Sequence, residues 1–143
     1  MKNYYILITS DSSDLEALAI FKKRIAEKKW PLYEKTTYLK KIATQDEIVF
    51  YLAGKGSNAQ TFIGTAVVND IHLNDNLLVD PDKDRNVVNR YIILNKIITF
   101  PNPIKIKSIL DKLQFIKNKK NYGAYLIGGV AKFNEQDFLK ISN

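Results

Sequence analysis

Cysteine is absent from the chain of 143 residues, and histidine and tryptophan each occur once. Without cysteine, neither disulfide bonds nor thiolate chemistry is available, and a lone His72 argues against a multi-histidine metal centre. No apolar run is long enough to span a bilayer, and the first residues lack the apolar core and cleavage site of a signal peptide. We therefore expect a soluble, cytoplasmic protein that uses no metal or cofactor and does not contact membranes.

Acidic residues are fewer than basic ones, which leaves a formal net charge of +7. Residues 15–41 carry eight lysines and arginines against three glutamates, and residues 105–120 carry six lysines against one aspartate. If these two segments meet in space, they form a surface that favours polyanions, nucleic acid first. The alternative is a set of solvated lysines without a partner. The aspartates gather in residues 69–84, as Asp70, Asp75, Asp80, Asp82 and Asp84.

The pattern of apolar residues predicts a single domain, residues 1–143, of the α+β class. Strands are predicted over residues 4–9, 47–53, 61–70, 87–100 and 122–129, the second and third joined as a hairpin. Helices are predicted over residues 14–28, 108–115 and 134–141. Regular alternation of strands and helices is missing, which favours a curled sheet or small barrel over a Rossmann-like sheet.

Several local signals mark the ends and bends of these elements. Ser13 and Glu16 fit a capping box for the first helix, and Asn134 fits a cap for the last. The sequence "PNP" at 101–103 is predicted to end the long strand, and "IKIK" at 104–107 to form a strand edge. Gly64, inside a strand, indicates a bulge or the close approach of another segment.

The only tryptophan stands in "KKWPLYEKTTYLKK", residues 28–41. Pro31 biases the backbone of Trp30 toward an extended conformation, so we expect the indole on a loop held by its proline. There it either covers the core or forms the wall of a binding pocket. Because aromatic side chains dominate core burial, these residues taken alone favour packing.

Familiar catalytic and phosphate-binding patterns are missing. "AGKGSN" at 53–58 has neither the spacing nor the following helix of a phosphate-binding loop, and we interpret it as a hairpin turn. The aspartates of residues 69–84 do not have the spacing of a calcium loop. We therefore predict that the protein is not an enzyme.

Four stretches resemble the EVE domain, a member of the PUA-like superfamily and a relative of the YTH domain. They are "YYILIT", "KKWPL", "LKKIATQDEIVFYLAG" with "TFIGTAVV", and "ILDKLQFIKNKKNYGAYLIGGVAKFNEQDF", which is typical of small stand-alone members. The chain departs from the family in having Gln45-Asp46 where a Gly-Asp turn is usual, and Tyr122 where tryptophan is common. The resemblance implies a PUA-like curled mixed sheet, or pseudo-barrel, flanked by short helices.

The resemblance also implies a pocket, beside a basic groove, for a flipped or single-stranded modified base. Such a base needs aromatic faces, polar groups that read its edge, and lysines that hold the backbone. The expected ligand-binding residues are Trp30, Pro31, Tyr33, Tyr5, Tyr51 and Tyr122. The expected backbone contacts are Lys28, Lys29, Lys35, Lys117, Lys119 and Lys120.

The leading hypothesis is thus a non-catalytic nucleic-acid-binding module, for RNA or DNA, that is a monomer or a weak homodimer. One alternative is an interaction or scaffold domain with non-specific affinity for nucleic acid, which would use an exposed edge such as "IKIK". Another is an enzyme acting on nucleotides, which would need an acid–base pair, such as Asp46 with a lysine.

Overall fold

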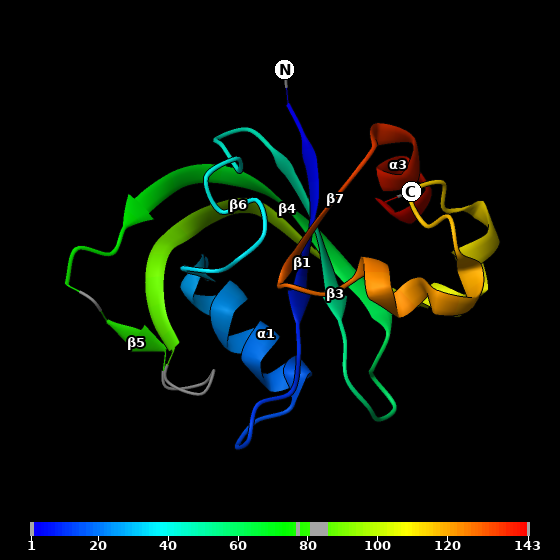
Figure 1. The fold of residues 1–143 in the computed structure, drawn as a ribbon, viewed down its shortest axis with the longest axis horizontal. Coiled ribbons are helices and arrows are strands. Elements are labelled where there is room, and N and C mark those ends of the chain that lie inside the picture. The colour runs from blue at the N-terminus through cyan, green and yellow to red at the C-terminus, as the bar shows by residue number, and fades with distance from the viewer. Residues whose placement is uncertain (1, 77, 81–85, 143) are drawn as a thin grey trace.

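One curled sheet organises the computed structural model, which describes residues 2–76, 78–80 and 86–142 (Figure 1). The strand order is β2-β6-β4-β3-β1-β7, and β5 pairs with β6. Strand β1 is parallel to β3 and the other pairs are antiparallel, so the sheet is mixed. The strands are β1 (Tyr4–Thr9), β2 (Lys29–Tyr33), β3 (Glu47–Leu52), β4 (Thr61–Leu73), β5 (Val79–Asp80), β6 (Asn86–Lys105) and β7 (Val130–Phe133).

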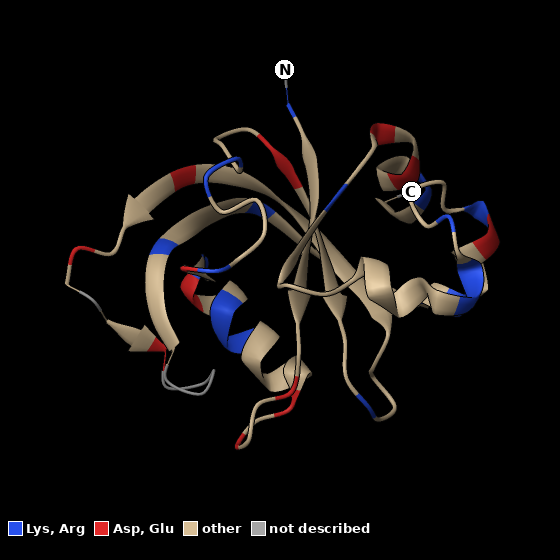
Figure 2. Ribbon diagram, in the orientation of Figure 1, with Lys and Arg blue, Asp and Glu red and all other residues tan. Residues whose placement is uncertain are grey.

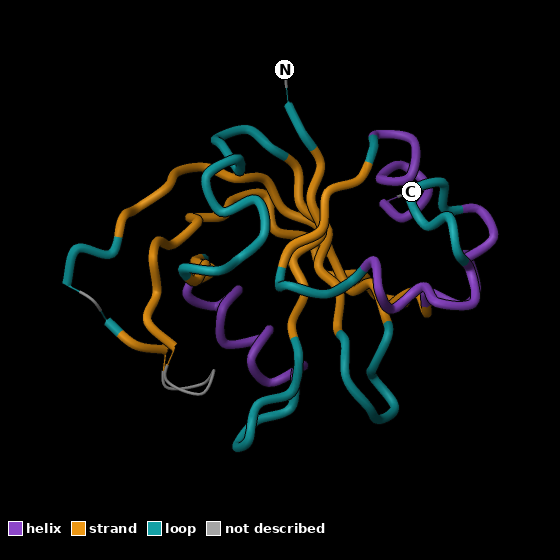
Figure 3. Tube along the Cα trace, viewed as in Figure 1, coloured by secondary structure: helices purple, strands orange, loops and turns teal. Residues whose placement is uncertain are grey.

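Helices cover the two sides of this sheet. Helix α1 lies inside the curl of β4 and β6, whereas the C-terminal helices gather on the other side (Figure 1 and Figure 3). The helices are α1 (Ala17–Glu27), α2 (Ile106–Ile109), η1 (Leu110–Lys112), η2 (Lys119–Tyr125) and α3 (Glu135–Ser142). The mixed α+β fold with a curled half-barrel sheet and short flanking helices, expected from the sequence, is confirmed.

Side-chain alternation along β1 divides the core into two clusters. Tyr5 and Leu7 point to the side of α1 and pack in one cluster with Phe21. Tyr4 points to the opposite side and packs in the second cluster, where its ring lies 5.1 Å from that of Phe138 in α3. A buried strand with helices on both faces is apolar at every position, which is the pattern of "YYILIT".

The predicted strand over residues 4–9, the hairpin of β3 and β4, and the cap of the last helix are confirmed. The side-chain oxygen of Asn134 accepts a hydrogen bond of 2.8 Å from the backbone N–H of Asp137. The predicted start of the first helix is wrong, because α1 begins at Ala17 and not at Asp14. Its first free amide is satisfied by Asp11, whose Oδ1 accepts from Ala17 N–H at 2.8 Å, and not by a Ser13 capping box.

The predicted loop position of Trp30 is also wrong. Trp30 and Pro31 lie inside β2, which pairs with β6 through the partners Trp30↔Ile92 and Pro31↔Tyr91. Proline cannot donate a ladder hydrogen bond, and it is tolerated here because β2 is the end strand of the sheet.

The last predicted strand and the end of the long strand need correction as well. Strand β6 continues through Pro101 and Pro103 to Lys105, and helix α2 begins at Ile106, so only the first half of "IKIK" is strand. Residues 119–125 form the helix η2, and β7 begins at Val130 after two glycines with positive φ.

The sequence leaves open whether the two basic segments meet in space. Figure 2 shows basic residues on α1 and the segment that follows β2, and others on the C-terminal helices across the sheet. The two basic segments therefore lie on different sides of the sheet. Asp70 lies in β4 and Asp80 in β5, whereas Asp82 and Asp84 lie outside the described residues.

Candidate nucleic-acid interface

A cavity of about 280 Å³ lies between β2, the end of β1 and the glycines before β7, and we call it the Trp30 cavity. Its volume is just below the roughly 300–1,000 Å³ that is usual for small-molecule sites. Strand β2 supplies Trp30, Pro31, Leu32 and Tyr33. The other lining residues are Ile8, Ser10, Arg24, Thr36, Gly128 and Gly129.

Trp30 is both a core residue and a wall of this cavity. Only 2% of its surface is exposed, and its ring lies 5.2 Å from that of Phe50. The guanidinium carbon of Arg24 lies 4.8 Å from the centroid of the indole, in a cation–π contact. The indole is therefore held between core and cavity, with an arginine already placed over its ring.

Arg24 belongs to a buried polar network at this cavity. Its Nη2 donates to the Tyr33 hydroxyl at 3.1 Å and forms an ion pair of 3.2 Å with Asp80 Oδ2. The Tyr33 hydroxyl donates to the same Asp80 oxygen at 2.5 Å. Burial raises the pKa of Tyr33 well above its usual value, which the Arg24 charge opposes and the Asp80 hydrogen bond reinforces. Tyr33 thus remains a neutral donor at any physiological pH.

A second, larger cavity of about 470 Å³ adjoins the first, and we call it the Tyr122 cavity. The two share four lining residues, Ile8, Ser10, Gly128 and Gly129. Tyr51 and Tyr122 line only the second cavity, so the six expected ligand-binding residues do not form one site. Tyr5 lines neither cavity; it is fully buried, with its ring 5.7 Å from that of Tyr38.

A basic hollow of about 420 Å³ continues from the Tyr122 cavity, with which it shares Gly54 and Gln60. Lys55, Lys105 and Lys107 line it, and we call it the lysine groove. None of these three was expected from the sequence as a binding residue. These lysines stand in "AGKGSN" and "IKIK". From the sequence, the two segments are interpreted as a hairpin turn and a strand edge, which does not identify their lysines as binding residues.

The six lysines expected to contact a nucleic-acid backbone lie outside both cavities. The Nζ of Lys29 lies 4.4 Å from the Tyr91 ring centroid, and Lys29 lines a hollow that shares Arg24 and Pro31 with the Trp30 cavity. Lys119 donates to the Leu113 carbonyl oxygen and has a structural role. The remaining four, Lys28, Lys35, Lys117 and Lys120, are exposed.

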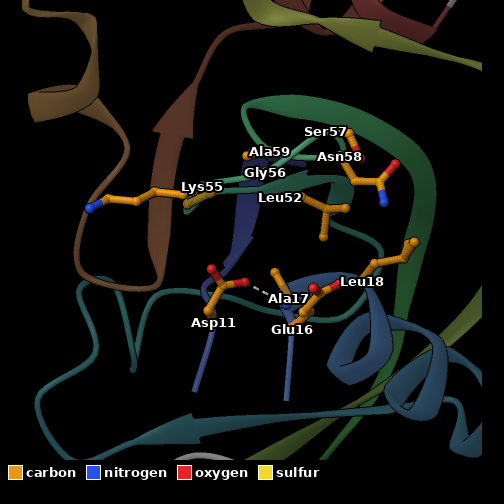
Figure 4. Close-up of a pocket in the computed structure, with 11 residues that line it drawn as sticks. Asp11, Glu16, Ala17, Leu18, Leu52, Lys55, Gly56, Ser57, Asn58 and Ala59 are labelled. Atoms are coloured by element: carbon orange, nitrogen blue, oxygen red, sulfur yellow. Dashed lines mark hydrogen bonds between the residues drawn. The ribbon is translucent and has the colours of Figure 1, made fainter. Parts of the chain in front are cut away.

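A small hollow of about 60 Å³ lies between the start of α1 and the turn that joins β3 to β4 (Figure 4). A water molecule needs roughly 10–15 Å³ in this measure, so the hollow has room for only a few waters. Figure 4 shows the Asp11 carboxylate turned toward Ala17, where it caps the helix. The free amide at this helix start is therefore already satisfied from within the chain.

The carboxylate considered for acid–base chemistry has a structural role. Asp46 is 2% exposed, and its two oxygens accept 2.9 Å hydrogen bonds from the backbone N–H groups of Asn3 and Ala43. His72 is exposed and pairs with Asp70 at 3.0 Å. In the described ranges, no three histidine or carboxylate side chains come together as metal ligands. None of the helices described there is long and apolar enough to cross a membrane.

No protein-family model matches the chain, and no curated protein matches it either. Solved structures do. Protein Atu2648 from Agrobacterium tumefaciens is similar with a TM-score of 0.57 at 14% identity, over 97% of this chain and 90% of that one. The fold is PUA-like. The N-terminal domain of McrB from Staphylothermus marinus is similar with a TM-score of 0.50 at 12% identity, over 99% and 93% of the two chains.

A hypothetical protein from Leishmania major is similar with a TM-score of 0.54 at 12% identity, over 99% of this chain and 92% of that one. At such identities the similarity extends to the fold and not to the side chains that line the cavities. Those side chains therefore have to be interpreted from their own chemistry.

Proposed function

We propose that this chain is a non-catalytic nucleic-acid-binding module of the EVE type, which accepts a flipped or single-stranded modified base in the Trp30 cavity. The observation that carries the proposal is the cavity itself, in which Trp30, Pro31 and Tyr33 stand beside the Arg24 guanidinium. The proposal treats residues 1–143 as one cytoplasmic domain that is a monomer or a weak homodimer.

The chemistry of the lining suits a base. Aromatic and guanidinium planes stack on nucleobases, and each such contact contributes about 1–3 kcal/mol. The Ser10 hydroxyl offers a donor and an acceptor for the edge of the ring. Arg24 lies over the indole, so an entering base would stack on the guanidinium or displace it.

The absence of catalysis is part of the proposal. General acid–base chemistry requires a titratable group within hydrogen-bond reach of the reacting atom. The Asp46 carboxylate is engaged by two backbone amides, and the exposed His72 lines neither cavity. Turnover of nucleotides or modified oligonucleotides is the measurement that would contradict this part of the proposal.

The proposal is tested by titrating Trp30 fluorescence with short single-stranded DNA and RNA. The panel carries 5-methylcytosine, 5-hydroxymethylcytosine, N6-methyladenine or no modification. We expect one modified oligonucleotide to change the emission and to bind at least tenfold more tightly than the plain one, a difference of about 1.4 kcal/mol. Equal binding of all oligonucleotides with unchanged emission would refute the proposal.

A matched pair of variants separates the cavity from general charge. Arg24→Gln and Lys22→Gln each remove one positive charge from α1, but only Arg24 lines the Trp30 cavity. We expect Arg24→Gln to abolish the preference for the modified base, while Lys22→Gln keeps it. Thermal melts identify conditions in which both variants are folded, since Arg24→Gln removes the ion pair between Arg24 and Asp80.

A further inference from the structure

The Tyr122 cavity has no role in the function proposed so far, although it is larger than the Trp30 cavity and adjoins it. Gly128 and Gly129, whose φ angles are +81° and +82°, line both cavities, and we call their backbone the glycine ridge. The ridge is anchored to β1, because Ile8 N–H donates to the Gly129 carbonyl oxygen at 2.8 Å. A Cβ on Gly128 would lie 2.8 Å from Thr37 Oγ1, so that face is already covered, whereas one on Gly129 would lie 3.9 Å from Thr36 Cγ2. Another chain can therefore approach the ridge closely at Gly129.

Tyr51 places an unused polar group in the Tyr122 cavity. Its side chain is 2% exposed and its ring packs 5.1 Å from that of Phe62, yet its hydroxyl has no hydrogen-bond partner among the described residues. Burial raises the pKa of Tyr51 above its usual value, and the nearby Tyr122 phenol adds to the rise. The hydroxyl therefore stays protonated and can donate to a ligand.

The lining of the cavity also includes an aromatic ring and an amide. The Tyr122 hydroxyl donates to Gln60 Oε1, which fixes the orientation of the amide and leaves its NH₂ group available. Ile127, which also lines the cavity, is 68% exposed, an unusual degree for an aliphatic side chain beside a hollow. A half-buried ring, an exposed apolar side chain and two donors form a suitable surface for a flat, polar-edged ligand.

We propose that the Tyr122 cavity is a second base subsite, which holds the neighbouring nucleotide of the strand whose flipped base occupies the Trp30 cavity. The inference rests on the proposed function of the Trp30 cavity. The sugar–phosphate chain passes the glycine ridge at Gly129, and the second base stacks on Tyr122 while its edge faces Tyr51 and Gln60. The strand then leads toward Lys55 and Lys107 of the lysine groove, which adjoins the second cavity. Lys105 of that groove already donates to the carbonyl oxygens of Ser57 and Ala59.

The subsite is tested by comparing ligands that reach one cavity with ligands that reach both. For each base of the oligonucleotide panel, the probes are the nucleoside, its 5′- and 3′-monophosphates, and the dinucleoside monophosphates with a plain base on either side. The plain base is attached through either the 5′ or the 3′ phosphate. For one of these two positions, we expect the dinucleoside monophosphate to bind at least tenfold more tightly than the monophosphate with its phosphate at the same position. A gain reproduced in full by the phosphate alone would overturn the second subsite.

Two variants test whether this gain in affinity arises in the Tyr122 cavity. Tyr122→Ala should reduce it to less than twofold and leave the affinity for the nucleoside unchanged, because Tyr122 does not line the Trp30 cavity. Tyr122→Phe, which keeps the ring and removes only the hydroxyl, should retain most of it. Thermal melts ensure that both variants are folded. If Tyr122→Ala weakens nucleoside and dinucleotide equally, or leaves the gain intact, the inference is wrong.

The outcomes also separate the inference from the function on which it rests. If a modified oligonucleotide binds selectively and Arg24→Gln removes the selectivity, but the dinucleotides show no gain, then only the second subsite is refuted. If no probe and no oligonucleotide binds with base preference, both proposals fail together.

Discussion

Trp30 illustrates how one side chain can meet two requirements at once. The residues around it favoured packing, and the family resemblance favoured a pocket wall. In the structure it is a member of the core cluster on the α1 side and also lines a cavity. Sequence could identify Trp30 as exceptional, but its neighbours Phe50 and Arg24 come from other elements and are not visible in the spacing of "KKWPL".

Truncation of this side chain should therefore affect stability first. We expect Trp30→Ala to lower the free energy of unfolding by about 3–5 kcal/mol, because it removes a large buried ring that packs against Phe50 and Phe21. Trp30→Phe, which keeps an aromatic ring at the site, should lose less. Urea unfolding followed by circular dichroism measures both variants. A change below about 0.5 kcal/mol for Trp30→Ala, the usual range for surface positions, would contradict the buried position.

At the scale of elements, the sequence predicted well where one local signal decides the structure. The strands over 4–9 and 47–52 are mostly apolar and rich in β-formers, and Asn134 caps α3 as its position indicates. Predictions failed where tertiary context decides. Strand β2 forms despite Pro31 because β6 provides an edge with which it pairs. Residues 122–129 contain many β-formers, yet they form the end of η2 and a turn with two glycines.

Two buried aspartates fix the loops between helices and strands by accepting hydrogen bonds from backbone N–H groups. Asp46 accepts from Asn3 and Ala43 at the turn before β3, and Asp137 accepts from the backbone N–H groups of Gln114 and Phe115 at 2.9 and 2.8 Å. Except for the local bond from Ala43 to Asp46, these pairings join residues far apart in the chain, so their partners could not be read from sequence. Gln45, beside Asp46 in this turn, adopts φ +75°, in the left-handed region that favours glycine.

Gly64 sets the contact between β4 and β6, and both the expected bulge and the expected close approach are confirmed. The register with β6 shifts on both sides of Gly64, and a Cβ there would lie 2.3 Å from the Ile98 carbonyl oxygen. We expect Gly64→Ala to destabilise the protein by about 1–3 kcal/mol, the usual cost of overpacking. Gly123→Ala, with nothing within 4 Å of the added methyl, is the matched control and should stay within about 0.5 kcal/mol. If the two variants have equal denaturation midpoints, β4 and β6 move apart at little cost to accommodate the added methyl group, and the prediction is wrong.

At the scale of the whole molecule, composition predicted the net charge but not its placement. The basic residues that make up the +7 charge are divided between the two sides of the sheet, and the three lysines of the lysine groove come from a hairpin turn and the junction of β6 with α2. Only the curl of the sheet brings these lysines, the glycine ridge and β2 into one sequence of hollows. A charge count cannot contain that information, because it depends on contacts between distant segments.

The tyrosines make the stability of the fold depend on pH. Five of them have a raised pKa in the folded protein, with burial as the main cause for four, Tyr5, Tyr33, Tyr51 and Tyr91. For the fifth, Tyr4, the hydrogen bond to Glu135 is the largest cause and raises the pKa to about 12. An unfolded tyrosine titrates near 10. Above that pH the unfolded chain binds fewer protons than the folded one, so stability falls as the pH rises.

We therefore expect the free energy of unfolding to be independent of tyrosine ionisation below about pH 10 and to decrease between about pH 10 and 12. Urea unfolding at successive pH values measures the decrease, and tyrosinate absorbance of the folded protein should rise later than that of the unfolded chain. Tyr4→Phe removes the phenol that donates to Glu135, so it should make the decrease in stability above pH 10 less steep. If Tyr4→Phe and the parent protein lose stability in parallel, the Tyr4–Glu135 hydrogen bond does not contribute to the pH dependence.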